Sequence, residues 1–188
     1  MGLPSVQQKE FPPVVVLDLD GVLNDHDQIM GKYPFPRPTT EDELRFLSEL
    51  GWEDTEEALY FFRMFSKRLT QRFARFATEV GASVVIASSV RKHYDLESIT
   101  KALRFYGVTC PILGITPFDI EPPEGFRYAR RGHEIQAWLD SHPEVTKFII
   151  LDDDSDMEHL MPHLVKTKNS EGFTEEVYQR TLRYLESC

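Results

Sequence analysis

The stretch VVVLDLDGVLND spans residues 14–25. Its first four residues are apolar and mostly β-branched, and two prolines precede them, as expected for a buried strand inside a parallel sheet. Asp18 and Asp20 follow directly. Because alternate residues of an extended backbone point the same way, both carboxylates should face one pocket. Gly21 then allows the chain to turn sharply.

The length and charge of the chain limit what this stretch can do. At 188 residues it suits a single domain over residues 1–188, long enough to bury roughly two thirds of the surface that the unfolded chain exposes. The formal net charge of -10 argues against broad adhesion to nucleic acid or to an anionic membrane, although one phosphate could be held at a locally basic site. No run approaches the roughly 20 apolar residues that span a bilayer. The two cysteines form no disulfide framework, so we expect reduced thiols and a soluble, cytoplasmic protein.

The rest of the chain alternates strands with helices. Short apolar runs predict further strands at residues 83–87, 108–113, 147–151 and 164–167. Apolar spacing, capping signals and terminal glycines predict helices at residues 40–50, 55–79, 96–106, 131–142 and after Thr174. This alternation predicts an α/β fold, a doubly wound (Rossmann-like) three-layer parallel sheet with helices on both faces. Residues 24–55 leave room only for a small cap-like insert or loop.

Three local patterns sharpen this outline. Thr40 and Glu43 have the spacing of a capping box that opens a helix. The aromatic run YFFRMF at 60–65 has helical spacing, which favours core packing over a substrate platform. Basic residues gather in RKH at 91–93 and in RYARR at 127–131, and such runs are usually solvated faces.

Polar side chains follow three of the predicted strands, where parallel sheets bind their ligands. They are Asp18, Asp20, Ser88, Ser89, Asp152, Asp153, Asp154 and Asp156. Four or more carboxylates that converge at one edge would repel each other unless a cation neutralised them. Ligand sets made only of oxygen favour Mg²⁺ over Zn²⁺, so we expect Mg²⁺ as the cofactor.

The pair Asp18 and Asp20 could carry out phosphoryl transfer. One carboxylate could attack phosphorus to form an aspartyl-phosphate, and its neighbour could protonate the leaving oxygen and later deprotonate water. An acid held close to a second carboxylate would have a raised pKa, as that role requires. The alternative is that the pair forms only a turn at the end of a strand, and the later acidic cluster weighs further against that interpretation.

These residues resemble the haloacid dehalogenase (HAD) superfamily of phosphatases and phosphotransferases, whose first motif is similar to DLDGVLN. The resemblance implies that Asp18 is the nucleophile and a metal ligand. It implies that Asp20 is the general acid and base and gives its backbone carbonyl to Mg²⁺. The second motif is a Ser or Thr after an apolar strand, and VVIASS matches it, so Ser88 is expected to bind a phosphoryl oxygen with Ser89 beside it.

The third motif of the superfamily is a Lys or Arg near the start of the helix that precedes the last acidic strand. Arg131 in RRGHEIQAWL fits it best, and Arg130 is the alternative. A guanidinium there would offset the charge of a phosphoaspartate, with help from the helix N-terminus. A surface arginine is the plainer interpretation of either residue.

The fourth motif is an acidic pair after a strand, and LDDDSDM resembles it. The resemblance implies that Asp152 and Asp153 belong to the magnesium shell. Asp156 is then a candidate for supporting them, and Asp154 is a loop residue. The matched motifs together span residues 14–157.

The chain also resembles compact phosphatase-type domains of some nucleic-acid repair polyproteins in four sequence segments, SSVR, RGHEIQAWL, DDDSDM and LVKT. Val90 stands where those domains usually have tryptophan. In this superfamily a small or absent cap is associated with large substrates. The expected function is therefore that of an Mg²⁺-dependent phosphomonoesterase. Its expected partner is a phosphorylated substrate, either a phosphoprotein or a nucleic-acid end.

Other functions remain open at this point. A phosphatase of small metabolites or nucleotides, or a phosphotransferase or mutase, would use the same residues. A receiver-type signalling domain would place its phosphorylated aspartate after a middle strand, where this chain has Ser88. A binding module without catalysis is the remaining class, and metal-dependent turnover of an aryl phosphate would exclude it.

Overall fold

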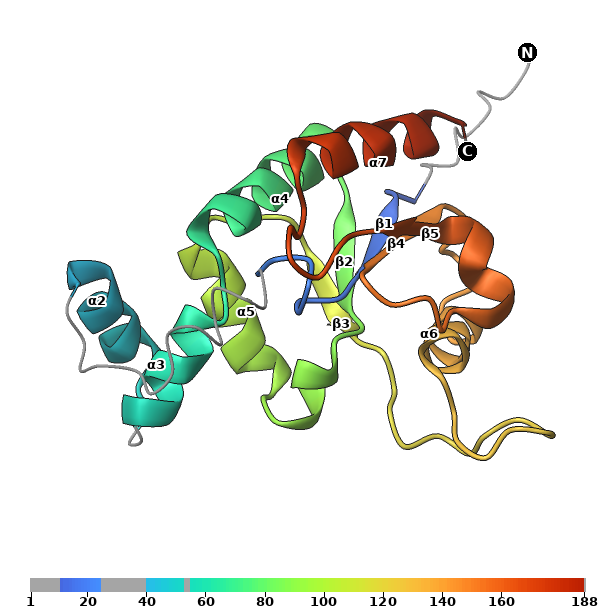
Figure 1. The fold of residues 1–188 in the computed structure, drawn as a ribbon, viewed down its shortest axis with the longest axis horizontal. Helices are drawn as coiled ribbons and strands as arrows, with labels where there is room; N and C mark the ends of the chain where they lie inside the picture. Colours follow the sequence, from blue (N-terminus) through green and yellow to red (C-terminus); the bar gives the residue numbers. More distant parts are fainter. Residues whose placement is uncertain (1–10, 25–39, 53–54, 188) are drawn as a thin grey trace, which may run out of the picture.

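A five-stranded parallel sheet forms the centre of the molecule in the computed structural model, which describes residues 11–24, 40–52 and 55–187 (Figure 1). The strands are β1 (Val14–Leu17), β2 (Ser83–Ile86), β3 (Ile112–Ile115), β4 (Phe148–Asp152) and β5 (Leu164–Lys166), in the order β3-β2-β1-β4-β5. The order reverses beside β1, whose neighbours are β2 and β4. This arrangement confirms the doubly wound fold, and its switch point lies where β1 and β4 end.

Helices cover both faces of the sheet. One face carries α4 (Lys67–Glu79), α5 (Leu96–Phe105) and α7 (Glu175–Ser187), and the other carries α6 (Arg131–Asp140) with the short 3-10 helix η2 (Glu158–His163). The four residues of β1 are fully buried and alternate between these two layers. A strand buried on both faces must be apolar throughout, which explains the run VVVL.

Two further helices, α2 (Glu41–Leu50) and α3 (Thr55–Arg63), form a lobe beside α5, at the left of Figure 1. The predicted capping box is present, since the Glu43 amide donates to the Thr40 hydroxyl at 3.2 Å and the Thr40 amide to the Glu43 carboxylate at 3.1 Å. Phe61 and Phe62 are buried, which confirms core packing of the aromatic run. Residues 25–39 and 53–54 of the predicted insert lie outside the described residues.

The predicted single helix over residues 55–79 is wrong, because the chain breaks between α3 and α4. The backbone N–H of Ser66 donates to the carbonyl of Leu23 at 2.9 Å, so it leaves the helical ladder. The Tyr106 hydroxyl donates at 3.1 Å to the Phe62 carbonyl, in the last turn of α3, which also accepts from the Phe65 amide at 3.3 Å. The bonds with Leu23 and Tyr106 come from distant parts of the chain, and no glycine or proline marks the break.

The predicted strand over residues 108–113 is displaced to Ile112–Ile115. Proline has no backbone N–H, so Pro111 can only accept a bond. Its carbonyl does so, from the Val84 amide at 2.8 Å, and the strand follows it. Within the described part of the chain, no helix combines the length and the apolar character needed to cross a membrane.

Candidate active site

Three aspartates meet where β1 and β4 end. Leu17 pairs with Leu151 in parallel register, and the Asp18 amide donates to the Leu151 carbonyl at 2.9 Å, so the residues after the two strands lie side by side. One carboxylate oxygen from each of Asp18, Asp152 and Asp153 lies within 4.8 Å of the other two. The spacing is small enough for all three to bind a single cation.

Burial raises the pKa of all three carboxyls. For Asp18 burial is the largest cause, and the Arg131 charge with hydrogen bonds from Ser88 and Leu19 lowers the pKa only in part. The pKa of Asp152 rises to about 7 through burial and the Asp18 charge, and the same two causes raise the pKa of Asp153. A cluster that resists full ionisation, with oxygen as its only donor, fits a hard divalent cation.

Gly21 makes room for the third carboxylate. Its φ of +65° lies in the left-handed region, and a Cβ there would stand 2.5 Å from Cγ of Asp153. The buried Thr167 hydroxyl donates to the Gly21 carbonyl at 2.7 Å and fixes this turn against the end of β5. The glycine of the DLDG motif is therefore required both by the turn and by the approach of Asp153.

Asp20 stands apart from the three clustered carboxylates, and a residue that the sequence reasoning missed holds it. The Asn24 amide group donates to Asp20 Oδ1 at 2.9 Å, and Asn24 Oδ1 accepts from the Gly21 amide at 2.9 Å. Asn24 is buried and Asp20 is half-buried, so one side chain locks both the turn and the carboxylate. The only sequence signal for it was an asparagine at the end of the turn, four residues after Asp20.

Arg131 brings a positive charge to this cluster. Its Nη1 lies 3.6 Å from Asp18 Oδ1 and 3.4 Å from Asp152 Oδ2, and it also donates to the Ala87 carbonyl. Burial alone would lower the pKa of the guanidinium, but the carboxylates, Asp18 first, raise it. The alternative candidate, Arg130, pairs instead with Glu158 at 2.9 Å.

Asp156 positions Arg131 through the backbone. Its carboxylate accepts from the Arg131 amide at 3.2 Å, and its carbonyl accepts from the Gly132 amide at 3.0 Å. The first turn of α6 is thus tied to the loop that follows β4. Asp154 is exposed, and its amide donates to Asp152 Oδ1 at 2.8 Å, which orients that carboxylate.

The two serines after β2 differ in their surroundings. Ser88 is completely buried beside Asp18, and its hydroxyl accepts from the Val90 amide at 3.4 Å as the cap of a short 3-10 helix, Ser89–Lys92. Its hydroxyl also lowers the pKa of Asp18 by hydrogen bonding. Ser89 is exposed. Ser88 therefore both caps the short helix and contacts Asp18.

Arg91 is the second residue that the sequence reasoning missed, because the run RKH was interpreted as a solvated face. Its side chain is only 1% exposed, and it pairs with Glu134 of α6 at 2.5 Å. It also donates to the carbonyls of Ala87, Ser88 and Thr116. A single buried guanidinium therefore ties the ends of β2 and β3 to the helix that carries Arg131.

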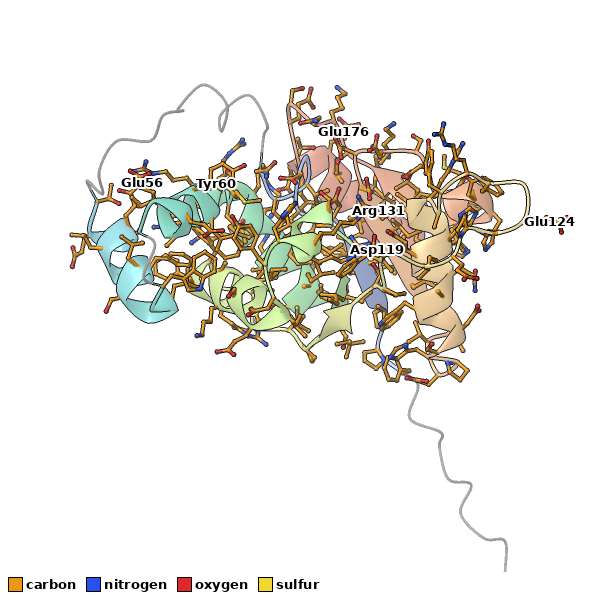
Figure 2. The ribbon with its side chains drawn as sticks, turned by 90° about the horizontal axis from the view of Figure 1, so that it is seen from below. Glu56, Tyr60, Asp119, Glu124, Arg131 and Glu176 are labelled. Atoms are coloured by element: carbon orange, nitrogen blue, oxygen red, sulfur yellow. The ribbon has the colours of Figure 1, made fainter. Side chains whose placement is uncertain are left out.

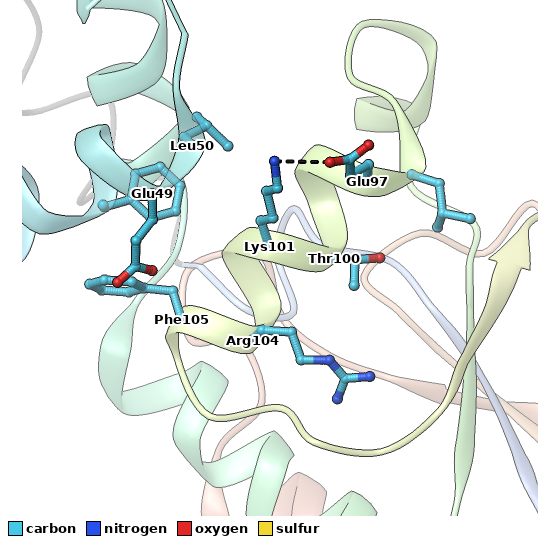
Figure 3. Close-up of a pocket in the computed structure, with 9 residues that line it drawn as sticks. Glu49, Leu50, Glu97, Thr100, Lys101, Arg104 and Phe105 are labelled. Carbon is cyan, nitrogen blue, oxygen red and sulfur yellow. Dashed lines mark ion pairs between the residues drawn. The ribbon is translucent and has the colours of Figure 1, made fainter.

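A cavity with a volume of about 680 Å³ lies away from these residues, between α2 and α5 (Figure 3). Phe46, Leu50 and Phe105 line it together with the exposed ion pair Lys101–Glu97, whose atoms are 2.9 Å apart. None of the predicted site residues belongs to it.

Comparison with known proteins identifies the family. A family model described as the HAD domain in Swiss Army Knife RNA repair proteins matches residues 14–177. No curated protein and no solved structure matches the chain. The matched span begins at the first residue of β1 and ends within α7, so it includes all five strands and every residue of the candidate site. The chain therefore belongs to the HAD domain family of Swiss Army Knife RNA repair proteins, within the HAD superfamily.

Proposed function

We propose that this protein is an Mg²⁺-dependent phosphomonoesterase that removes a terminal phosphate from nucleic acid through an aspartyl-phosphate on Asp18. The observation that carries the proposal is the meeting of Asp18, Asp152 and Asp153 within 4.8 Å, beside Arg131 and Ser88. Among macromolecular phosphates, the RNA repair context of the family favours a nucleic-acid end over a phosphoprotein.

Asp18 and Asp20 share the chemical work. The Asp18 carboxylate attacks phosphorus, the bond from phosphorus to the leaving oxygen breaks, and Asp20 gives that oxygen a proton. Asp20 then takes a proton from water, which attacks the phosphoaspartate, breaks its P–O bond and releases inorganic phosphate. The hydrogen bond that the Asn24 side-chain amide donates to Asp20 Oδ1 holds the acid in place for both steps.

The remaining residues handle charge. Arg131 and the Ser88 hydroxyl bind the phosphoryl oxygens, since both already contact Asp18. Asp18, Asp152 and Asp153 would hold Mg²⁺, and the Asp20 carbonyl would be a further ligand. When bound, the ion neutralises the carboxylates and the charge that develops on the phosphoryl group.

The test is a substrate panel assayed with the purified chain in Mg²⁺ and in chelator. It contains oligoribonucleotides phosphorylated at the 3′ or the 5′ end, nucleotides, phosphopeptides and an aryl phosphate, and release of inorganic phosphate separates hydrolysis from transfer. We expect metal-dependent hydrolysis that is best with phosphorylated oligoribonucleotides. Absence of turnover for every phosphate ester in Mg²⁺ would exclude the proposed function, and a clear preference for phosphopeptides would exclude the nucleic-acid substrate.

A further inference from the structure

The segment between β3 and α6, residues 116–130, begins and ends at the candidate site. At its start the Thr116 amide donates to the carbonyl of Ile86, at the end of β2, at 2.9 Å. At its end comes Arg131, which contacts Asp18. In between it projects from the body on the side where the strands end (Figure 1), and Figure 2 shows Glu124 at its far end.

The returning half of this segment, residues 126–130 with the sequence FRYAR, is here called the aromatic arm. Tyr128 is 66% exposed and Phe126 is 37% exposed. His133 touches the Phe126 ring edge to face at 4.6 Å between centroids, and the Arg130 guanidinium lies 5.7 Å from the centre of the same ring. Phe126 is therefore held in a fixed orientation, while most of the Tyr128 ring faces solvent.

Charge is divided between the two halves of the segment. The outgoing half contains three exposed acidic residues, Asp119, Glu121 and Glu124, whereas the aromatic arm contains two arginines and leads to a third, Arg131. Arg127 is exposed and forms no ion pair with any residue that the structure describes. Arg130 is paired with Glu158 and Arg131 lies among the site carboxylates, so Arg127 offers an exposed positive charge three residues before the aromatic arm ends at the proposed phosphate site.

We propose that the aromatic arm binds the nucleotides next to the terminal phosphate of a single-stranded RNA, an inference that rests on the proposed function. A base stacks on Tyr128, and the exposed Arg127 binds a backbone phosphate while Arg131 holds the terminal one. Exposed aromatic rings with interleaved arginines suit unpaired bases, which can leave their own stack to lie on a ring, whereas bases in a duplex cannot. The acidic outgoing half repels the strand and confines it to the arm.

The test measures kcat/KM for phosphate release from a phosphorylated hexaribonucleotide and from the matching mononucleotide, and takes their ratio. Tyr128→Ala should lower this ratio about tenfold by raising KM for the hexamer, Tyr128→Trp should restore it, and Arg127→Ala should lower it about fivefold. Matched controls are Tyr60→Ala, an exposed tyrosine on α3, and Arg183→Ala, an exposed arginine on α7, both expected to keep the wild-type ratio.

A second measurement separates the arm from the chemistry. Fluorescence anisotropy with an unphosphorylated, single-stranded hexaribonucleotide in chelator should show binding that Tyr128→Ala weakens and Tyr60→Ala does not. An unchanged ratio and unchanged binding in Tyr128→Ala would overturn the role of the arm while the phosphatase stands. If no phosphate ester is turned over, the proposed function fails, and loss of binding in Tyr128→Ala would still support the arm. Loss of phosphopeptide turnover in Tyr128→Ala, with RNA binding unaffected, would assign the arm to a protein substrate and overturn the proposal.

Discussion

The candidate site and the cavity between α2 and α5 show two different ways of placing charge. At the site, Asp18, Asp152 and Arg131 are buried or nearly so, and ion pairs between their side chains hold them close together. In the cavity, the charged side chains are long and exposed, such as Lys101 and Glu97. Charges kept away from water have shifted pKa values and attract a ligand charge strongly, whereas exposed charges do neither, so the cavity is the weaker candidate for chemistry.

The largest effect should come from removing the proposed nucleophile. Asp18→Asn removes the attacking carboxylate, so kcat should fall by roughly 10⁴-fold or more, with far-ultraviolet circular dichroism unchanged. Steady-state phosphate release measures it. Asp154→Asn, an exposed aspartate in the loop after β4, and Thr100→Val, in the cavity, are the controls and should keep wild-type kcat. Full activity in Asp18→Asn would refute the assigned nucleophile.

Breaking the buried ion pair between Arg91 and Glu134 should destabilise the fold far more than breaking the exposed ion pair between Lys101 and Glu97. Arg91→Met leaves Glu134 buried without its partner, so the free energy of unfolding should fall by about 3–5 kcal/mol. Lys101→Ala removes an exposed pair on α5 and should cost no more than about 0.5 kcal/mol. Urea denaturation measures both. Adding Glu134→Leu to Arg91→Met should recover part of the loss, and equal losses for Arg91→Met and Lys101→Ala would contradict the distinction drawn here.

A methyl group at Gly21 should damage metal binding specifically. Gly21→Ala would strain the turn and push Asp153 away, so we expect Mg²⁺ affinity to fall by about 100-fold, in the range that disturbed metal-ligand geometry produces. Titration calorimetry measures the affinity. Gly81→Ala is a matched control, since Gly81 has a similar φ of +63° but nothing lies within 4 Å of the added Cβ. It should cost stability of about 1–2 kcal/mol and leave Mg²⁺ affinity intact. Equal metal affinities in the two variants would show that Asp153 needs no room at Gly21.

The pH dependence of stability should be the smallest effect. The pKa of Asp152 is raised from 3.8 to about 7 in the folded protein, so its protonated form stabilises the metal-free fold below pH 3.8. That stability is lost as pH rises from 3.8 through about 7, and Mg²⁺ should therefore raise Tm more at pH 8 than at pH 5.5. Thermal melts in chelator and in Mg²⁺ measure this. Asp152→Asn should flatten the slope in chelator, and an unchanged slope in that variant would assign the effect to other groups.

Much of the fold was predictable from local patterns. The run VVVL identified a strand buried on both faces, and the capping box at Thr40 marked the start of α2 correctly. The break between α3 and α4 was not predictable, because the bonds that cause it come from Leu23 and Tyr106, far away in the sequence. The spacing of apolar residues shows that a segment prefers to form a helix. It does not show which distant residues compete for the hydrogen bonds of its backbone.

The sequence by itself determined which residues are candidates for the chemistry: acidic and hydroxyl side chains placed directly after apolar strands, and the glycine that turns the chain after Asp20. Only the tertiary structure decided which of them meet. It places Arg131 against Asp18 and pairs Arg130 with Glu158. It also buries Arg91 against Glu134 and leaves most of Tyr128 exposed. The reason is physical, since residue type and spacing fix local direction, whereas burial and pairing depend on which distant elements pack together.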